Sequence, residues 1–193
     1  MNNEFNISGI LRDVKVNHEQ QNGVVIYSGV VDSKIRGKEY HIPVRFQENV
    51  KEIYKLKEGL KVNLTGELRT QKKKEDKHLS LVPYFYVMQS RPHKTDYNYG
   101  RLVGKVCKRF PVIKRKDHNI CSLIVAVQRH NSEQYDYIPV VGHNLTANLF
   151  STLSIGSTIV VSGTFKQRKY HEKKTGDTKY TYEVNVDKFS IKL

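Results

Sequence analysis

The chain has 193 residues, enough for one large hydrophobic core or for two small ones. Its hydrophobic content of 38% and charged content of 27% are typical of a globular protein and exclude a disordered chain. The formal net charge of +14 favours a polyanionic partner, either nucleic acid or an anionic membrane surface.

Membrane insertion and disulfide bonding are not expected. The longest apolar runs, such as residues 123–127, are far shorter than the ~20 residues of a membrane span. The N-terminus lacks the basic and apolar segments of a signal peptide, so a cytoplasmic protein is predicted. The two cysteines, Cys107 and Cys121, lie in strand-like segments without a CxxC pair, which predicts reduced thiols and no structural metal or cofactor.

In chain order, two similar sets of segments follow each other. Each set opens with a short apolar strand, Ile7–Leu11 in the first and Leu102–Val106 in the second. The tripeptide Ile-Pro-Val at 42–44 recurs at 138–140, and the glycine pair at 59 and 66 recurs at 156 and 163. Two anchors in the same order and at nearly the same spacing indicate an internal duplication.

Within each copy the hydrophobic residues mostly alternate, as they do in residues 60–68 and 159–165, which predicts β-strands. Gly66 and Gly163 lie inside these strand patterns, where glycine commonly marks a bulge or a barrel bend. Residues 49–56 and 144–153 instead show helical spacing, and each segment ends before a glycine.

Each copy is therefore predicted to run strand, strand, strand, helix, strand, strand, which is the order of the OB-fold. The predicted fold is all-β, with two tandem five-stranded barrels that each carry one short helix between strands three and four. The polar, aperiodic segment 91–98 is the predicted linker between domains at 1–90 and 99–193.

The second copy resembles the bacterial single-stranded-DNA-binding protein family over nearly its whole length. The resemblance rests on segments in the family's order: 102–104, 123–129, 137–141 with Ala147, 156–163, 168–170, Gly176 and 180–184. It implies an OB-fold, single-stranded DNA wrapped over the surface, and assembly into four barrels, which a two-barrel chain would reach as a homodimer. Typical members also end in an acidic tip that recruits replication and repair proteins. The sequence ends at Phe189–Leu193 without such a tip and contains no Trp, so strand coating is expected rather than recruitment.

Strand alternation predicts which residues of the second copy share the outer face. Ile138, Val140 and Phe165 are expected to point into the barrel. The outward residues are then Tyr135, Tyr137, His143, Lys166, Arg168 and Tyr170. Aromatic rings can stack on unpaired bases and cations can bind phosphates. The resemblance implies stacking at Tyr137 and Tyr170, with His143 near a third such position. The alternative is that these aromatic residues are ordinary components of a barrel surface.

Two basic loops of the second copy are further candidates for phosphate binding. The hairpin between strands four and five contains Lys169, Lys173, Lys174 and Lys179, and the loop between strands one and two contains Lys114, Arg115 and Lys116. OB-folds use these two loops to grip oligonucleotides. The alternative is a solvated charged surface.

The first copy retains cations but not aromatic residues at the equivalent positions, which are His41, Arg45, Arg69 and Lys73. Phe46 is expected to point inward. Residues 1–96 contain 17 basic and 12 acidic residues, against 16 and 7 in residues 97–193. We therefore expect the second barrel to supply stacking, and the first to follow phosphates or to build an assembly interface.

No sequence motif supports catalysis, because phosphate-loop, zinc-protease and nucleophile-elbow patterns are all absent. The predicted function is binding of single-stranded DNA with little sequence specificity in replication, recombination or repair, with RNA left open as a further ligand. The alternative is a primosome-like or recombination accessory protein that uses its barrels chiefly for protein partners.

Overall fold

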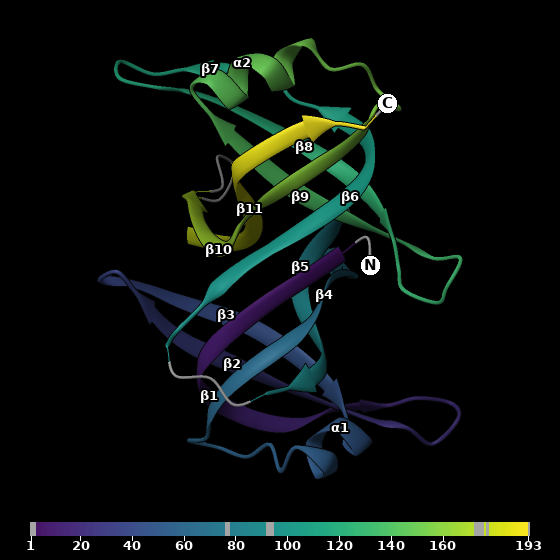
Figure 1. Ribbon diagram of the computed structural model, residues 1–193. Coiled ribbons are helices and arrows are strands. Elements are labelled where there is room, and N and C mark those ends of the chain that lie inside the picture. The colour runs from purple at the N-terminus through teal and green to yellow at the C-terminus, as the bar shows by residue number, and fades with distance from the viewer. Residues whose placement is uncertain (1–2, 76–77, 92–94, 172–175, 177, 193) are drawn as a thin grey trace. The chain divides into compact units, whose positions relative to one another are not determined.

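The computed structural model describes residues 3–75, 78–91, 95–171, 176 and 178–192, apart from the side chains of residues 73–75, 78, 79, 170, 171 and 179. It contains eleven strands and two helices within this part of the chain (Figure 1). The strands of the first copy are β1 (Asn3–Glu19), β2 (Val25–Ile35), β3 (Lys38–Gln47), β4 (Lys61–Glu75) and β5 (His78–Ser90). Those of the second are β6 (Asn98–Arg109), β7 (Ile113–Lys114), β8 (Asn119–Gln128), β9 (Tyr135–His143), β10 (Thr158–His171) and β11 (Thr178–Ile191).

The helices occupy the predicted places. Helix α1 (Glu48–Ile53) follows β3, and α2 (Leu145–Thr152) follows β9. The face of α2 that packs on the barrel consists of Ala147 and Phe150, whereas Leu145 and Leu149 are exposed. Helical spacing alone thus located the helix, but it did not identify the residues that its barrel buries. No helix in the described residues is long and apolar enough to cross a membrane.

Five strands close a barrel in each copy. In the first, β1 pairs with β2 and β4, β2 with β3, β3 with β5, and β5 with β4. In the second, β6 pairs with β8 and β10, β8 with β9, β9 with β11, and β11 with β10, while β7 adds a short pairing to β8. The β3–β5 and β9–β11 pairs are parallel, and the β1–β2, β1–β4, β2–β3, β6–β8, β6–β10, β7–β8, β8–β9 and β10–β11 pairs are antiparallel. The predicted fold, two five-stranded OB-type barrels, is confirmed.

The chain divides into two compact units. The N-terminal unit comprises Glu4–Leu68 and Tyr84–Tyr99, and the C-terminal unit comprises Met1–Asn3, Arg69–Pro83 and Gly100–Leu193. The distal ends of β4 and β5 thus belong to the C-terminal unit. The linker at 91–98 is predicted from the internal repeat. Whether the segments on its two sides fold independently stays a prediction.

Strand alternation places the core as expected. In the first barrel Ile42, Val44 and Phe46 are buried, and in the second Ile138, Val140 and Phe165 are buried. Burial of a side chain of this size stabilises the folded state by about 1.5–3 kcal/mol, so the parity of each strand is strongly fixed. The opposite face of each strand is left for polar and aromatic side chains.

The glycine in the middle of each fourth strand is required by close backbone contact. A Cβ on Gly66 or Gly163 would collide with the backbone carbonyl of Tyr86 or Asn185, respectively. Gly163 also lies at a register shift between β10 and β11, as expected for a bulge. These glycines therefore let the fourth and fifth strands approach each other where the barrel bends.

We expect Gly163→Ala to lower the free energy of unfolding by about 1–3 kcal/mol, because the added methyl group must displace backbone rather than a side chain. Urea unfolding followed by circular dichroism measures this change. Thr164→Ala, at the next position of the same strand, is the control. A loss no larger than that of the control would contradict the close-contact explanation.

Candidate nucleic-acid interface

The outer face of the second barrel carries the predicted aromatic residues of β9. Tyr135 and Tyr137 are 51% and 40% exposed, while Ile138 and Val140 are fully buried. Across the β8–β9 ladder, Tyr137 lies opposite the small residue Ala126. The two tyrosines thus point away from the core, as strand alternation predicts.

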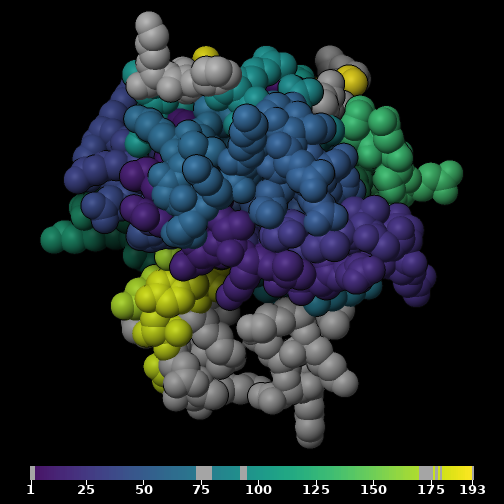
Figure 2. All heavy atoms as spheres, turned by 90° about the horizontal axis from the view of Figure 1, so that it is seen from below, coloured from purple at the N-terminus to yellow at the C-terminus, as the bar shows by residue number. Residues whose placement is uncertain are grey.

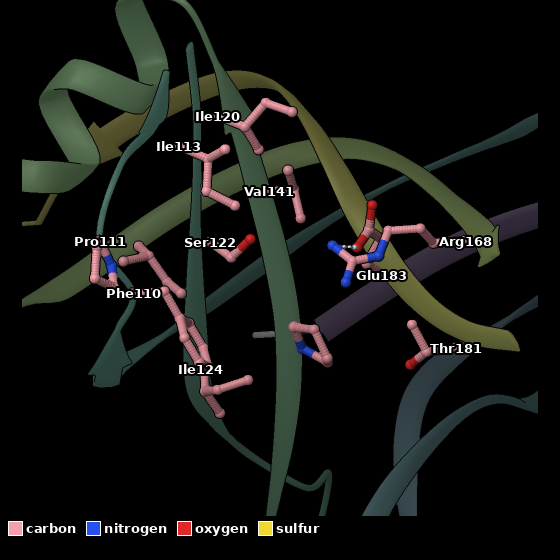
Figure 3. Close-up of a pocket in the computed structure, with 12 residues that line it drawn as sticks. Phe110, Pro111, Ile113, Ile120, Ser122, Ile124, Val141, Arg168, Thr181 and Glu183 are labelled. Atoms are coloured by element: carbon pink, nitrogen blue, oxygen red, sulfur yellow. Dashed lines mark ion pairs between the residues drawn. The ribbon is translucent and has the colours of Figure 1, made fainter. Parts of the chain in front are cut away.

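A hollow of about 270 Å³ lies farther along this face (Figure 3). Its lining is mostly apolar: Phe110, Pro111, Ile113, Ile120, Ser122, Leu123, Ile124, Pro139, Val141, Arg168, Thr181 and Glu183. On neighbouring strands β8 and β9, Ile124 lies opposite Pro139 and Ser122 lies opposite Val141. An apolar hollow on a solvent-facing sheet is suited to binding a flat, weakly hydrated group.

The sequence analysis did not identify this hollow. Its signal is the continuous apolar run 123–127, because such a run on a strand makes both faces apolar. Leu123 and Val125 fill the barrel, which leaves Ile124 for the outer face. The hollow also needs β7 and the fifth strand, and their places beside β8 and β9 are decided only by folding.

One side of the hollow is charged. Figure 3 shows Arg168 and Glu183 beside each other, away from Phe110, Pro111 and Ile113, and an Arg168 Nη1 atom lies 3.4 Å from a Glu183 carboxylate oxygen. The Glu183 side chain is only 6% exposed. Burial raises the pKa of Glu183, and the positive charges of Arg168, Lys166 and His143 oppose this rise. The ion pair therefore masks an acidic group on a face where cations are gathered.

His143 and Lys166 meet at the side chain of Asn185. His143 Nε2 lies 2.8 Å from Asn185 Oδ1, and Lys166 Nζ donates to the same oxygen at 3.0 Å. The His143 and His118 rings are also close, with 6.2 Å between centroids. The predicted outward residues His143 and Lys166 are therefore brought together, by a fifth-strand residue that the sequence analysis did not consider.

The β10–β11 hairpin separates the predicted cations onto two faces. Lys166 and Arg168 share the face of Glu183, whereas Lys169 lies opposite Tyr180 on the other face. Position 170 pairs with position 179, but the side chains of Tyr170 and Lys179 lie outside the described part of the chain. Lys173 and Lys174, at the tip, also lie outside the described residues.

The first loop of the second barrel contains exposed cations. Lys114, in β7, and Arg115 and Lys116 after it are all exposed. Arg109 instead donates to the carbonyl oxygens of Ser151 and Leu153, which anchors the C-terminal end of α2. The Arg109 side chain therefore has a structural contact with the end of α2.

A buried ion pair fixes the start of β9. Arg129 Nη2 and Nε donate to the two carboxylate oxygens of Asp136, at 2.8 and 3.0 Å. Within the same unit, Thr70 donates to Asp136 from its backbone N–H at 2.8 Å and from its hydroxyl at 3.2 Å. The backbone N–H of Tyr137 donates to this hydroxyl at 3.3 Å. A satisfied buried carboxylate is costly to disturb, so the contacts hold the backbone of Tyr137 in place.

The outer face of the first barrel is more aromatic than the sequences of its third and fourth strands suggest. On β3, His41 is bound to Asp32 at 2.7 Å, and Arg45 lies over the ring of Tyr84 from β5. Arg69 is half-buried on β4, and the side chain of Lys73 lies outside the described residues. Phe46 points inward, as predicted. The first barrel thus has aromatic residues on its outer face, but they come from its fifth strand.

In the described residues, no group of three or more His, Cys, Asp or Glu side chains is placed to hold a metal ion. The outer face of the second barrel combines an apolar hollow, two exposed tyrosines and exposed cations.

We expect Glu183 to make stability depend on pH. Because burial raises its pKa above the value in the unfolded chain, its contribution is present below the unfolded-state pKa and is lost as pH rises through the folded-state pKa. The free energy of unfolding of the wild type should therefore fall relative to that of Glu183→Gln as pH rises above about 4, the usual pKa of a glutamate. Urea unfolding at a series of pH values measures the difference. Glu133→Gln, which removes an exposed carboxylate, is the control, and parallel curves for Glu183→Gln and wild type would refute the expectation.

Comparison with solved structures identifies similar folds. Two crystal structures of the single-stranded DNA binding protein from Thermus aquaticus, one wild-type and one a deletion mutant, superimpose with TM-scores of 0.76. The deletion mutant is 16% identical and the wild type 15% identical, and the matches cover 100% of this chain and 95% and 93% of those chains, respectively. At this identity the likeness establishes the fold.

No curated protein sequence shows a significant match to the chain. The model of the single-strand binding protein family matches residues 97–192, which include β6–β11 and α2. This range contains the aromatic residues, the hollow and the two basic loops described above. Through its second barrel, the chain belongs to the single-strand binding protein family.

Proposed function

We propose that the chain coats single-stranded DNA with little sequence specificity, and that the outer face of the second barrel is its main binding surface. Family membership makes the chain a non-enzymatic protein that binds single-stranded DNA. The observation that carries the finer proposal is the shared face of Tyr137, the apolar hollow and the cations Lys166 and Arg168. Unpaired DNA offers flat bases and a phosphate backbone, which are the partners of these two kinds of group.

The binding mode follows from the chemistry of the face. Bases stack on Tyr137 and enter the hollow against Ile124 and Pro139, and each stacked base contributes about 1–3 kcal/mol. Apolar walls and ring faces accept all four bases, because every base has a π-face, so binding is largely non-specific. The Arg168–Glu183 pair keeps the buried carboxylate from repelling nearby phosphates.

The basic loops extend this binding surface along the bound DNA strand. Lys114, Arg115 and Lys116 belong to the first loop, and the sequence of the second hairpin contains Lys169, Tyr170, Lys173, Lys174 and Lys179. Phosphate contacts release counterions, so they make affinity fall steeply with salt. We assign to these residues the contacts with DNA phosphates on either side of the stacked bases.

The biological role we propose is strand protection in replication, recombination or repair, by a cytoplasmic homodimer that presents four barrels. We infer the homodimer from the family members that have two barrels per chain. The competing function is a primosome-like or recombination accessory protein that acts through protein partners. Ligand preference separates these functions, because only the first requires tight binding to unpaired strands.

We expect the protein to bind dT oligomers more tightly than RNA of equal length, and both more tightly than duplex DNA. Fluorescence anisotropy at about 50 mM and 200 mM salt should show a loss of at least about tenfold for the dT oligomer, because phosphate contacts release counterions. Sedimentation of the free protein in the same buffer reports the oligomeric state. Equal, weak affinity for all three ligands would favour the accessory function.

A charge placed in the hollow should weaken binding. We expect Ile124→Glu to reduce dT-oligomer affinity by about 5- to 100-fold, which corresponds to the loss of roughly one stacked base. The control is Ile155→Glu, in which the same change is made at a residue 61% exposed after α2. Both variants change the net charge equally, so an equal loss of affinity would indicate a general charge effect and contradict the role of the hollow.

A further inference from the structure

The third and fifth strands of the first barrel bring an arginine and two tyrosines onto one outer face. Val44 pairs with Phe85 and Arg45 with Tyr86 across the parallel β3–β5 ladder. Val44 and Phe85 point into the core and are buried. Strand alternation therefore turns Arg45, Tyr84 and Tyr86 to the outside, where all three are half-buried.

Arg45 and Tyr84 form a stacked pair. The Arg45 Cζ atom lies 4.3 Å from the centroid of the Tyr84 ring, which is the geometry of a cation–π contact. A guanidinium group is planar and stacks on aromatic rings, and its edge still carries N–H donors. The pair therefore combines a flat surface with a positive charge.

The barrel core does not require this pair. The interior beneath it is formed by Val44, Phe46 and Phe85, which are all buried. Figure 2 shows the purple-to-blue atoms of the first half of the chain at the molecular surface. Arg45 and Tyr84 both belong to the N-terminal unit, so their contact is formed within one compact part of the chain.

The second barrel has different residues at the same places. Its parallel ladder pairs Val140 with Val184, as Val44 pairs with Phe85 in the first. The positions of Arg45 and Tyr84 are then occupied by Val141 and Glu183. At these two equivalent places the first barrel has a cation on its third strand and a tyrosine on its fifth, whereas the second barrel has a valine and an acid. The stacked cation and ring of the first barrel therefore have no counterpart at the equivalent positions of the second.

We propose that Arg45 and Tyr84 form a second base-stacking site for single-stranded nucleic acid, on the first barrel, with Tyr86 extending it. This inference rests on the proposed function of the second barrel. A base stacks on the guanidinium plane, Tyr84 supports that plane from below, and the guanidinium edge donates to a neighbouring phosphate. The first barrel then contacts bases as well as phosphates, so a strand that spans both barrels is stacked at both.

The absence of Trp from the sequence allows a direct test, because a single introduced Trp reports on one position. Three variants are compared: Tyr84→Trp, Tyr137→Trp on the second barrel, and Ile53→Trp on α1, where the native residue is 68% exposed. Titration with a dT oligomer long enough to span two barrels should quench Trp fluorescence in the first two variants and leave the third nearly unchanged. Quenching of Tyr137→Trp alone would overturn the inference and leave the proposed function intact. Quenching of none of the three would contradict the proposed function as well.

Affinity measurements make the test independent of the Trp variants. Arg45→Lys keeps the charge but removes the planar group, and we expect it to weaken binding of the long dT oligomer by about 5-fold or more. The matched control is Lys61→Arg, a conservative exchange of a cation at the start of β4 in the same unit. Binding of a short oligomer of roughly 8 nucleotides, which one barrel can hold, should change much less in Arg45→Lys.

Each result of the affinity measurements bears on the stacking site. Unchanged binding of the long oligomer by Arg45→Lys would mean that Arg45 acts only as a charge, which overturns the inference. Equal losses for Arg45→Lys and Lys61→Arg would do the same. If Arg45→Lys leaves DNA binding intact but abolishes binding of a protein, the surface serves a protein partner and not a nucleic acid. Circular dichroism and thermal unfolding of each variant verify that the barrels remain folded.

Discussion

The parallel pairing of the third and fifth strands is the constraint on which both candidate surfaces depend. Each barrel closes only when its fifth strand lies beside its third, through Val44 and Phe85 in the first and Val140 and Val184 in the second. Because these residues must fill the core, their neighbours must face outward. The pairing therefore places Asn185 against His143 and Tyr84 against Arg45, although more than 35 residues separate the members of each pair.

On the outer face of the second barrel, several cations are gathered around the buried acid Glu183. Glu183 lies between Arg168 and the Lys166–Asn185–His143 contacts, and its burial raises its pKa. A lone buried carboxylate would repel a phosphate chain, but the surrounding cations compensate its charge. The Arg168 side chain is also half exposed to solvent, so under the proposed function it contacts DNA phosphates as well as Glu183.

The duplicated barrels have kept the same fold but carry different outer faces. The core positions that close the barrel are aliphatic or aromatic in both copies, and the glycine of the fourth strand is retained because a side chain would strike backbone. No such requirement acts on the outward residues. Tyr137 with the apolar hollow in one barrel, and Arg45 with Tyr84 in the other, are two ways of offering a flat surface beside positive charge.

The sequence by itself determined the duplication, the strand order, the helix positions and the face of each residue on its strand. These features depend on local periodicity and on a repeat, so Tyr137, Lys166 and Arg168 could be assigned to one face without a structure. Only the tertiary structure decided which strands lie side by side. It showed the hollow formed by β7, β8, β9 and β11, the partners of Glu183 and Asp136, and the stacking of Arg45 on Tyr84. Such contacts join residues far apart in the chain, and alternation within a strand carries no information about which strand will be its neighbour.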